Sequence, residues 1–202
     1  MCVKIVIGLG NPGPKYDATR HNVGWWVVDR LAYDWGFGSF EKEDRALVTE
    51  GDVGGSHVQL VKPTTYMNRS GLSLLRLSEM ESFRIKEDLL VVVDDAALEV
   101  GRVRCRPEGG SGGHKGLKSV SGVLQSDAYA RLRIGVGLKP EGQDLADWVL
   151  SRMPQEDEDI VVDLLPIMTG AVEAWIEDGT EAVMNHFNQS VSYTHLTLPT
   201  KA

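Results

Sequence analysis

The residues of this chain best suited to chemistry are side chains, most of them polar, in loops that follow predicted strands. They are Asn11, Tyr16, His21, Tyr66, Met67, Asn68, Asp94, His114 and Lys115. Imidazole, carboxylate and amide groups exchange protons and form hydrogen bonds, and α/β sheets place their sites at the ends of strands. Each of these residues taken alone is more often structural. Their common position at strand ends predicts a functional site.

Two glycine-rich motifs match sequence patterns of other functions, but neither meets the structural requirements of its pattern. GLGNPG at residues 8–13 matches the dinucleotide-binding pattern, and GGSGG at residues 109–113 matches the pattern around a nucleophilic serine. The first fails because Pro12 has no N–H to offer a pyrophosphate and the next helix is predicted only near Asn22. The second fails because a run of glycines satisfies it trivially and no strand ends immediately before Ser111.

The charge of the chain is distributed unevenly. Its net charge is −8, yet the stretch from Arg102 to Lys139 holds eight basic and two acidic residues, a local balance of +6. The remainder therefore carries −14. A basic strip on an acidic body suits a polyanion that approaches from one side. On charge alone, the alternative that these are merely exposed strand residues is equally acceptable.

The candidate site residues are positioned by predicted strands that alternate with predicted helices. The strands are 3–9, 58–61, 89–93, 102–106 and 132–136. The helices are 22–35, 70–83, 114–124 and an acidic helical region from about 144 to 186. This alternation, without repeats or a linker, predicts a single α/β domain with a mixed sheet between helical layers.

The composition narrows the class of protein further. The 202 residues are 42% hydrophobic and 25% charged, which is typical of a globular chain. No apolar run approaches the roughly 18 residues of a membrane span, and the start of the chain does not match a signal peptide. The only cysteines, Cys2 and Cys105, exclude a disulfide framework and favour a reducing cytoplasm.

The end of the chain is expected not to belong to the domain. Residues 191–200, VSYTHLTLPT, back-translate to what resembles a sequencing adapter read through as protein, so we exclude 191–202 from the fold. A native disordered tail is the alternative.

Five segments together resemble bacterial peptidyl-tRNA hydrolases in order and spacing. They are IVIGLGNPGPKYDATRHNVGWWVVD, VKPTTYMNRSG, LLVVVDD, GGSGGHKGLKSV and RLRIGVG. The resemblance covers roughly residues 1–188, which we take as the domain. It implies a three-layer α/β/α fold and a monomeric, cytoplasmic enzyme of translation and ribosome rescue. Such an enzyme hydrolyses the ester between a peptide and the 3′ end of tRNA without a metal or other cofactor.

The resemblance also implies roles for four residues in the reaction. His21 takes the position of the catalytic base that activates water, and Asp94 that of the acid that supports it. Asn11 matches an asparagine that helps to distinguish peptidyl from free aminoacyl substrates. Asn68 matches an asparagine of the cleft, which either binds substrate or stabilises the oxyanion; sequence leaves both open.

Further positions correspond to contacts with tRNA or substrate in the family: Tyr16, Tyr66, Met67, Asn68, His114, Lys115, Arg104, Arg106 and Arg133. Flat tyrosine rings can stack on unpaired bases, and Arg133 matches a basic residue associated with the 5′-phosphate. Lys115 departs from the family pattern, which most often has asparagine after the histidine of the glycine loop. Its role in tRNA contact is therefore open.

Two alternatives from other classes remain. A non-catalytic RNA-binding protein on the same fold is disfavoured by the complete set Asn11, His21, Asn68 and Asp94. A nucleotide-dependent oxidoreductase would reveal itself by NAD(P) binding in a thermal-shift titration.

Overall fold

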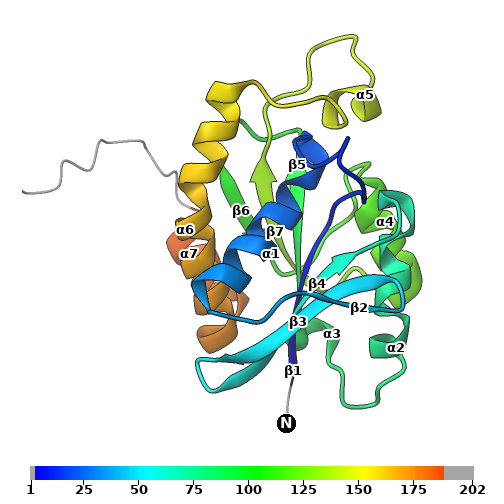
Figure 1. Cartoon of the computed structure of the whole chain (residues 1–202), viewed down its shortest axis with the longest axis vertical. Helices are drawn as coiled ribbons and strands as arrows, with labels where there is room; N and C mark the ends of the chain where they lie inside the picture. Colours follow the sequence, from blue (N-terminus) through cyan, green and yellow to red (C-terminus); the bar gives the residue numbers. More distant parts are fainter. Residues whose placement is uncertain (1–2, 189–202) are drawn as a thin grey trace, which may run out of the picture.

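The computed structural model describes residues 3–188, and its core is a seven-stranded mixed sheet with helices on both faces (Figure 1). The strand order is β2-β3-β4-β1-β5-β7-β6, in which β4, β1, β5 and β7 are parallel. The strands are β1 (Val3–Gly8), β2 (Glu41–Glu43), β3 (Ala46–Val53), β4 (Ser56–Pro63), β5 (Leu89–Asp95), β6 (Val103–Arg106) and β7 (Ala130–Gly135). The predicted fold class is confirmed.

The helices form two layers. One layer consists of α1 (Val23–Asp34), α6 (Gln155–Asp178) and α7 (Thr180–Phe187). The other consists of η2 (Met67–Leu74), α2 (Leu75–Ser78) and α4 (Lys115–Leu124), while α3 (Ile85–Asp88) leads into β5. The 3-10 helix η1 (Arg20–Asn22) and α5 (Leu145–Val149) lie near the carboxyl ends of the parallel strands.

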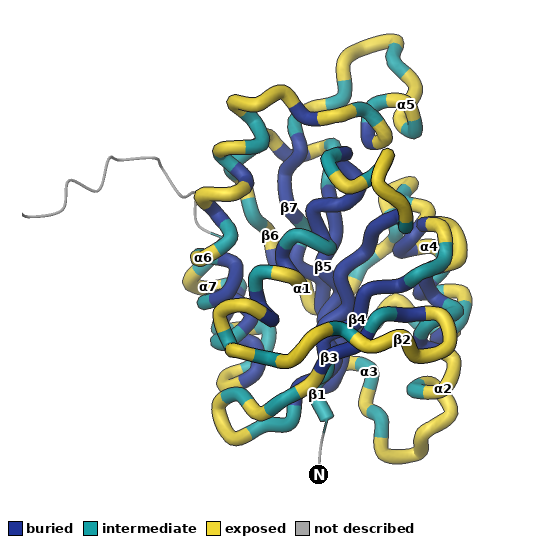
Figure 2. The backbone as a smooth tube through the Cα atoms, in the orientation of Figure 1, coloured by how far each residue is buried: buried dark blue, intermediate teal, exposed yellow. Residues whose placement is uncertain are grey.

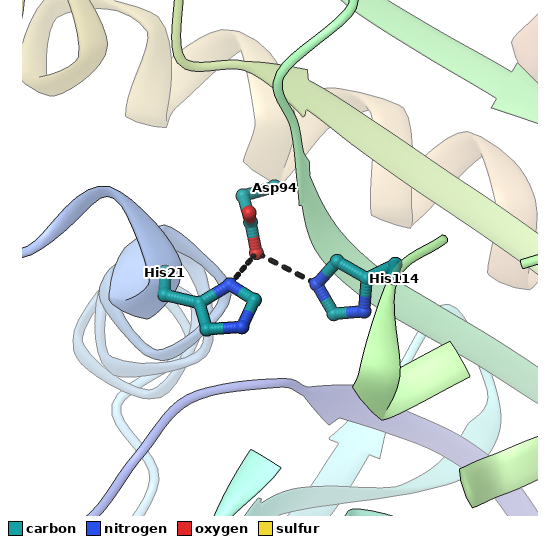
Figure 3. A group of neighbouring side chains, drawn as sticks. All are labelled: His21, Asp94 and His114. Atoms are coloured by element: carbon teal, nitrogen blue, oxygen red, sulfur yellow. Dashed lines mark hydrogen bonds and ion pairs between the residues drawn. The ribbon is translucent and has the colours of Figure 1, made fainter. Parts of the chain in front are cut away.

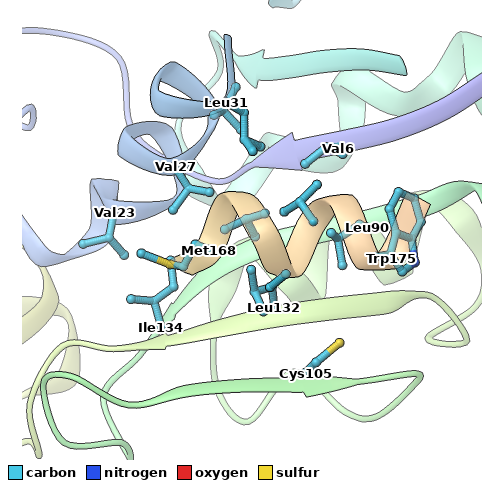
Figure 4. Packing of buried hydrophobic residues seen from close by; sticks show 14 of the residues in the cluster. Val6, Val23, Val27, Leu31, Leu90, Cys105, Leu132, Ile134, Met168 and Trp175 are labelled. Carbon is cyan, nitrogen blue, oxygen red and sulfur yellow. The ribbon is translucent and has the colours of Figure 1, made fainter. Parts of the chain in front are cut away.

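Successive side chains of a strand point to opposite faces of the sheet, so the strands contribute to the hydrophobic clusters under both helical layers. In β1, Ile5 and Ile7 join the cluster on the α4 side, whereas Val6 joins the cluster beneath α1 and α6. Figure 4 shows the second of these clusters, where Trp175 and other side chains of α6 pack on the sheet. The central strands are buried along almost their whole length (Figure 2), as expected for parallel strands covered on both faces.

Strands β2 and β3 are not among the predicted elements. Glu50, Gly51 and Asp52 are residue types that strands disfavour, and they occupy the second half of β3. Continuous antiparallel pairing of β3 with β4, from Ala46 to Val53, overrides that local preference.

The predicted helix 70–83 is wrong, because this segment forms only η2 and the four residues of α2. The hydroxyls of Ser70, Ser73 and Ser78 each donate to a main-chain oxygen three residues earlier, which competes with regular helix formation. Gly71 packs directly on α4, where a Cβ would meet the Ser119 carbonyl oxygen at 2.2 Å.

The other predicted helices are confirmed with adjusted boundaries. Residues 22–35 form α1 and residues 114–124 form α4, while the acidic region divides into α5, α6 and α7. Pro154 and Gly179 lie at the two divisions around α6. Of the helices within residues 3–188, none combines the length and apolar character that a membrane crossing requires.

The last described residue, Asn188, closes the free edge of the sheet. Its side-chain oxygen accepts from the Cys105 N–H at 2.6 Å, and its amide nitrogen donates to the Cys105 carbonyl oxygen at 3.0 Å. The amide thus satisfies the outward-facing peptide groups of an edge strand, as a neighbouring strand would. The predicted tail 191–202 lies outside the described residues.

We expect Asn188→Ala to lower the free energy of unfolding by about 1–3 kcal/mol, because two hydrogen bonds are lost. Asn188→Asp should have an intermediate effect, since it keeps an acceptor for the Cys105 N–H and loses the donor. Urea unfolding measures both. An unchanged midpoint for Asn188→Ala would show that this contact does not contribute.

Candidate active site

The parallel strands end at a cavity of about 640 Å³. It is lined by ten of the twelve predicted site residues: Asn11, Tyr16, His21, Tyr66, Met67, Asn68, Asp94, His114, Lys115 and Arg133. The other two, Arg104 and Arg106, lie outside it on the edge strand β6. The loops after β1, β4 and β5 therefore bring together residues that are distant in sequence, as the strand-end argument predicts.

At the centre of this cavity, one carboxylate oxygen contacts two imidazoles (Figure 3). Asp94 Oδ1 lies 2.9 Å from His21 Nδ1 and 2.9 Å from His114 Nε2. Asp94 is the penultimate residue of β5, His21 lies in η1, and His114 immediately precedes α4. Asp94 and His21 are buried, and His114 is nearly so.

The surrounding contacts determine which nitrogen of each ring carries the proton. His114 Nδ1 accepts from the backbone N–H groups of Gly116 and Leu117, as the N-cap of α4, so the ring proton is on Nε2 and is donated to Asp94. His21 Nδ1 also faces the Asp94 carboxylate and donates to it. The lone pair of His21 is therefore on Nε2, which does not contact Asp94.

The two imidazole rings stabilise the negative charge of the Asp94 carboxylate. Burial alone would raise the pKa of Asp94, but the interactions with His21 and His114 outweigh it and keep this pKa well below its usual value. The carboxyl group therefore remains ionised throughout the pH range in which an imidazole gains its second proton.

His21, Asp94 and His114 also form the kind of group that can hold a metal ion, with ligand atoms within 4.8 Å of one another. The protonation pattern opposes it. A metal on His114 Nε2 would require the ring proton to move to Nδ1, where two backbone N–H groups already donate. The cluster is better suited to transferring a proton than to binding a cation.

Asn11 is held in place by a residue that the sequence analysis missed. The Asn22 side chain accepts from the Asn11 N–H and donates to the Asn11 carbonyl oxygen, both at 2.9 Å. Asn11 Oδ1 in turn accepts from the Met67 N–H at 2.8 Å. The Asn11 amide therefore presents its NH₂ group to a ligand, while its oxygen is already engaged.

The basic strip lies on one face of β6 and β7, and its arginines on β7 contact the glycine loop, residues 109–113. Arg104 pairs in register with Arg133, and Arg106 with Arg131, so all four side chains lie on the same face of β6 and β7. Arg104 and Arg106 are exposed. Counting Arg131 in a solvent-facing strip is wrong, because it is fully buried and donates to the carbonyl oxygens of Gly109 and Asp127.

Arg133 lies between the cavity and the strip. It donates to Asp95 Oδ2 and to the Gly110 carbonyl oxygen, each at 3.1 Å. Its guanidinium is thus oriented, and partly neutralised, by Asp95.

Aromatic and basic side chains form the rim of the cavity. The Tyr16 and Tyr66 rings meet edge to face with centroids 6.4 Å apart, and Tyr66 is 59% exposed. Lys115 is exposed at the first position of α4. The rim therefore presents flat rings and a positive charge to a ligand that enters from solvent.

Comparisons of sequence and of structure with known proteins point to one family. A family model described as "Peptidyl-tRNA hydrolase" matches residues 5–194. The peptidyl-tRNA hydrolase of Gemmatimonas aurantiaca is 45% identical over 186 residues, covering 91% of this chain and 98% of the relative. That of Lachnoclostridium phytofermentans is 43% identical, covering 92% and 96%. The crystal structure of peptidyl-tRNA hydrolase from Acinetobacter baumannii superposes with a TM-score of 0.85 at 30% identity, covering 93% and 95%.

The capping role of His114 can be separated from its contact with Asp94. We expect His114→Ala to lower the free energy of unfolding by about 0.5–2 kcal/mol, because α4 loses its N-cap acceptor. His114→Asn should retain most of that stability, since an asparagine oxygen also accepts at an N-cap. Urea unfolding of the two variants tests this, and equal loss of stability in both would contradict it.

Proposed function

Because the chain belongs to the peptidyl-tRNA hydrolase family, we propose that His21 is the general base with which it hydrolyses the ester bond of peptidyl-tRNA. The products are free tRNA and peptide. The observation that supports this assignment is the proton pattern of the site: both imidazoles donate to Asp94, which leaves His21 Nε2 as an acceptor at the cavity.

The reaction follows from this arrangement. His21 Nε2 removes a proton from a water molecule, and the hydroxide oxygen attacks the ester carbonyl carbon. Asp94 stabilises the imidazolium that forms, as the orienting acid does in a catalytic triad. When the tetrahedral intermediate collapses, the ester C–O bond breaks and His21 Nε2 returns its proton to the departing 3′-oxygen of the tRNA.

The two asparagines differ in what they offer to the substrate. Asn11 offers NH₂ donors, which suit the carbonyl oxygen of a peptide bond, because its own oxygen is engaged by Met67. Asn68 is exposed in the cavity and offers its amide to the carbonyl oxygen that becomes the oxyanion. Their separate positions allow one residue to read the peptide while the other serves the reacting ester.

The tRNA is assigned to the rim and the basic strip. Tyr16 and Tyr66 stack on unpaired 3′-terminal bases, with Met67, His114 and Lys115 beside them. Arg104, Arg106 and Arg133 bind phosphates on the face that β6 and β7 share. Phosphate contacts orient the RNA without reading its sequence, which suits an enzyme with many tRNA substrates.

The proposal also covers the compartment, the oligomeric state, the need for a cofactor and the bounds of the domain. The enzyme acts as a cytoplasmic monomer without a cofactor, in keeping with the buried free thiol of Cys105 and a site that works by proton transfer. The native domain is residues 1–188, supported by the contact of Asn188 with the sheet edge. A non-catalytic RNA-binding role is not favoured, because the base and its carboxylate are both in place.

We expect His21→Ala to lower kcat by about 10²–10⁴-fold with little change in tRNA binding, because only proton transfer is lost. Asp94→Asn should lower kcat less, since an amide oxygen still accepts from His21 Nδ1 but carries no charge to stabilise the imidazolium. His57→Ala is the matched control, because that histidine lies on β4 away from the cavity. Near-normal kcat in His21→Ala would refute the mechanism.

The basic face should make binding strongly dependent on salt. Arg104→Ala, Arg106→Ala and Arg133→Ala should each reduce the slope of log K against log[salt] by up to about 1. Arg45→Ala, in the turn between β2 and β3 at the opposite edge of the sheet, is the control and should leave the slope unchanged. A short peptidyl ester without the tRNA body should be hydrolysed equally by all four variants; loss there would mean that the arginines support the fold instead.

A further inference from the structure

One wall of the cavity is formed by part of the connection between β7 and α6. This segment, residues 137–150, contains α5 and stands apart from the two helical layers (Figure 1). It contributes to the lining of the cavity Lys139, Asp144, Leu145, Ala146, Val149 and Leu150. Its position therefore contributes to the width of the cavity.

Arg20 contacts both ends of this segment. Its Nε donates to the Val136 carbonyl oxygen at 3.1 Å, where the segment begins. Its Nη1 donates to Ser151 Oγ at 2.7 Å and to the Arg152 carbonyl oxygen at 2.9 Å, where the segment ends. The guanidinium thus joins the residues that flank the two ends of the segment.

The same guanidinium also contacts α5, at the C-terminal end of the segment. It stacks on the Trp148 ring, with its carbon 3.7 Å from the ring centroid. Trp148 in turn donates its Nε1–H to the Gly137 carbonyl oxygen at 3.1 Å, and Ser151 Oγ donates to the Trp148 carbonyl oxygen at 2.6 Å. Arg20 is therefore the common point to which the beginning, α5 and the end of the segment are attached.

Only an arginine can make this set of contacts. Its planar fork presents several N–H groups in fixed directions and stacks on Trp148, whereas a lysine donates from a single nitrogen and has no planar group to stack on the ring. Arg20 is 2% exposed. Burial lowers the pKa of its guanidinium and the nearby Asp157 carboxylate opposes that effect, so its donors must be satisfied within the protein.

Arg20 is also the residue immediately before His21. Both belong to η1, with Arg20 directed to the segment 137–150 and His21 directed to Asp94. The Arg20 N–H additionally bonds the Ser151 carbonyl oxygen at 3.3 Å. A displacement of the guanidinium would consequently alter the spacing between the histidine and the opposite cavity wall.

We propose that Arg20 is a positioning residue that fixes segment 137–150 at a set distance from His21, and so determines how the substrate fits in the cavity. This inference rests on the proposed function for its kinetic consequence, while its structural consequence is independent of activity. Arg20 itself touches neither the substrate nor the reacting atoms.

The test uses Arg20→Lys, which keeps the charge and removes the fork. Hydrogen–deuterium exchange should become faster at backbone amides of residues 137–150, with the amides of β1, β5 and α6 unchanged. With peptidyl-tRNA, kcat/KM should fall by about 10- to 100-fold, mainly through KM, because the cavity wall is misplaced. The pH dependence of kcat should not move, since the contact of His21 with Asp94 is retained.

Arg152→Lys is the matched control. The Arg152 side chain is exposed and only its backbone oxygen meets Arg20, so exchange and kinetics should match those of the unaltered protein. Because exchange needs no turnover, failure of the general-base assignment, detected by His21→Ala, is distinguishable from failure of this proposal.

Two further variants keep the test decisive if Arg20→Lys does not fold. Ser151→Ala and Trp148→Phe leave Arg20 in place. The first removes the Ser151 hydrogen bonds to Arg20 and to the Trp148 carbonyl oxygen, and the second removes the bond from Trp148 Nε1 to the Gly137 carbonyl oxygen. Both should show the same local increase in exchange and a smaller rise in KM. Normal exchange at 137–150 and a normal KM, with only a lower melting temperature, would overturn the proposal and reduce Arg20 to a support of the fold.

Discussion

The site depends on a single buried carboxylate that must remain charged. A lone buried carboxylate would take up a proton, so Asp94 is compensated by two imidazole N–H groups on the same oxygen. That requirement fixes the orientation of both rings. It leaves His21 with an accepting nitrogen, and it makes His114 serve Asp94 with one nitrogen and the first turn of α4 with the other. The geometry of the proposed base and the capping of α4 are therefore parts of one hydrogen-bond network.

The glycine loop offsets a repulsion between arginines of neighbouring strands. Arg104 and Arg133 face each other across β6 and β7, as do Arg106 and Arg131, and opposed like charges destabilise a sheet. The loop offsets this repulsion by turning carbonyl oxygens of Gly109 and Gly110 toward the two arginines on β7. The backbone at Gly112 has φ of 58°, a conformation that favours glycine, within the turn that leads to His114.

Sequence reasoning succeeded where chain geometry alone determines proximity. Parallel strands end at one edge, so Asn11, His21 and Asp94 could be predicted to meet once their strands were recognised. It could not supply the protonation state of His114, because that depends on amides of α4. It also missed Asn22 and Arg20, whose types are unremarkable in a loop and whose roles exist only through contacts with residues far away in the fold.

The distribution of charge favours the orientation proposed for the RNA. Outside residues 102–139 the chain carries −14, so a polyanion is repelled from most of the body and attracted to the face beside the cavity. Because Arg131 is buried and Arg133 is shared with Asp95, that attraction falls mainly on exposed residues such as Arg104, Arg106 and Lys118. Arg104 and Arg106 lie outside the cavity that contains Asp94, and additional positive charge in that cavity would compete with the imidazolium for the carboxylate. In the proposed mechanism, this separation of phosphate contacts from the proton-transfer site allows binding to the RNA body to position the ester without disturbing the base.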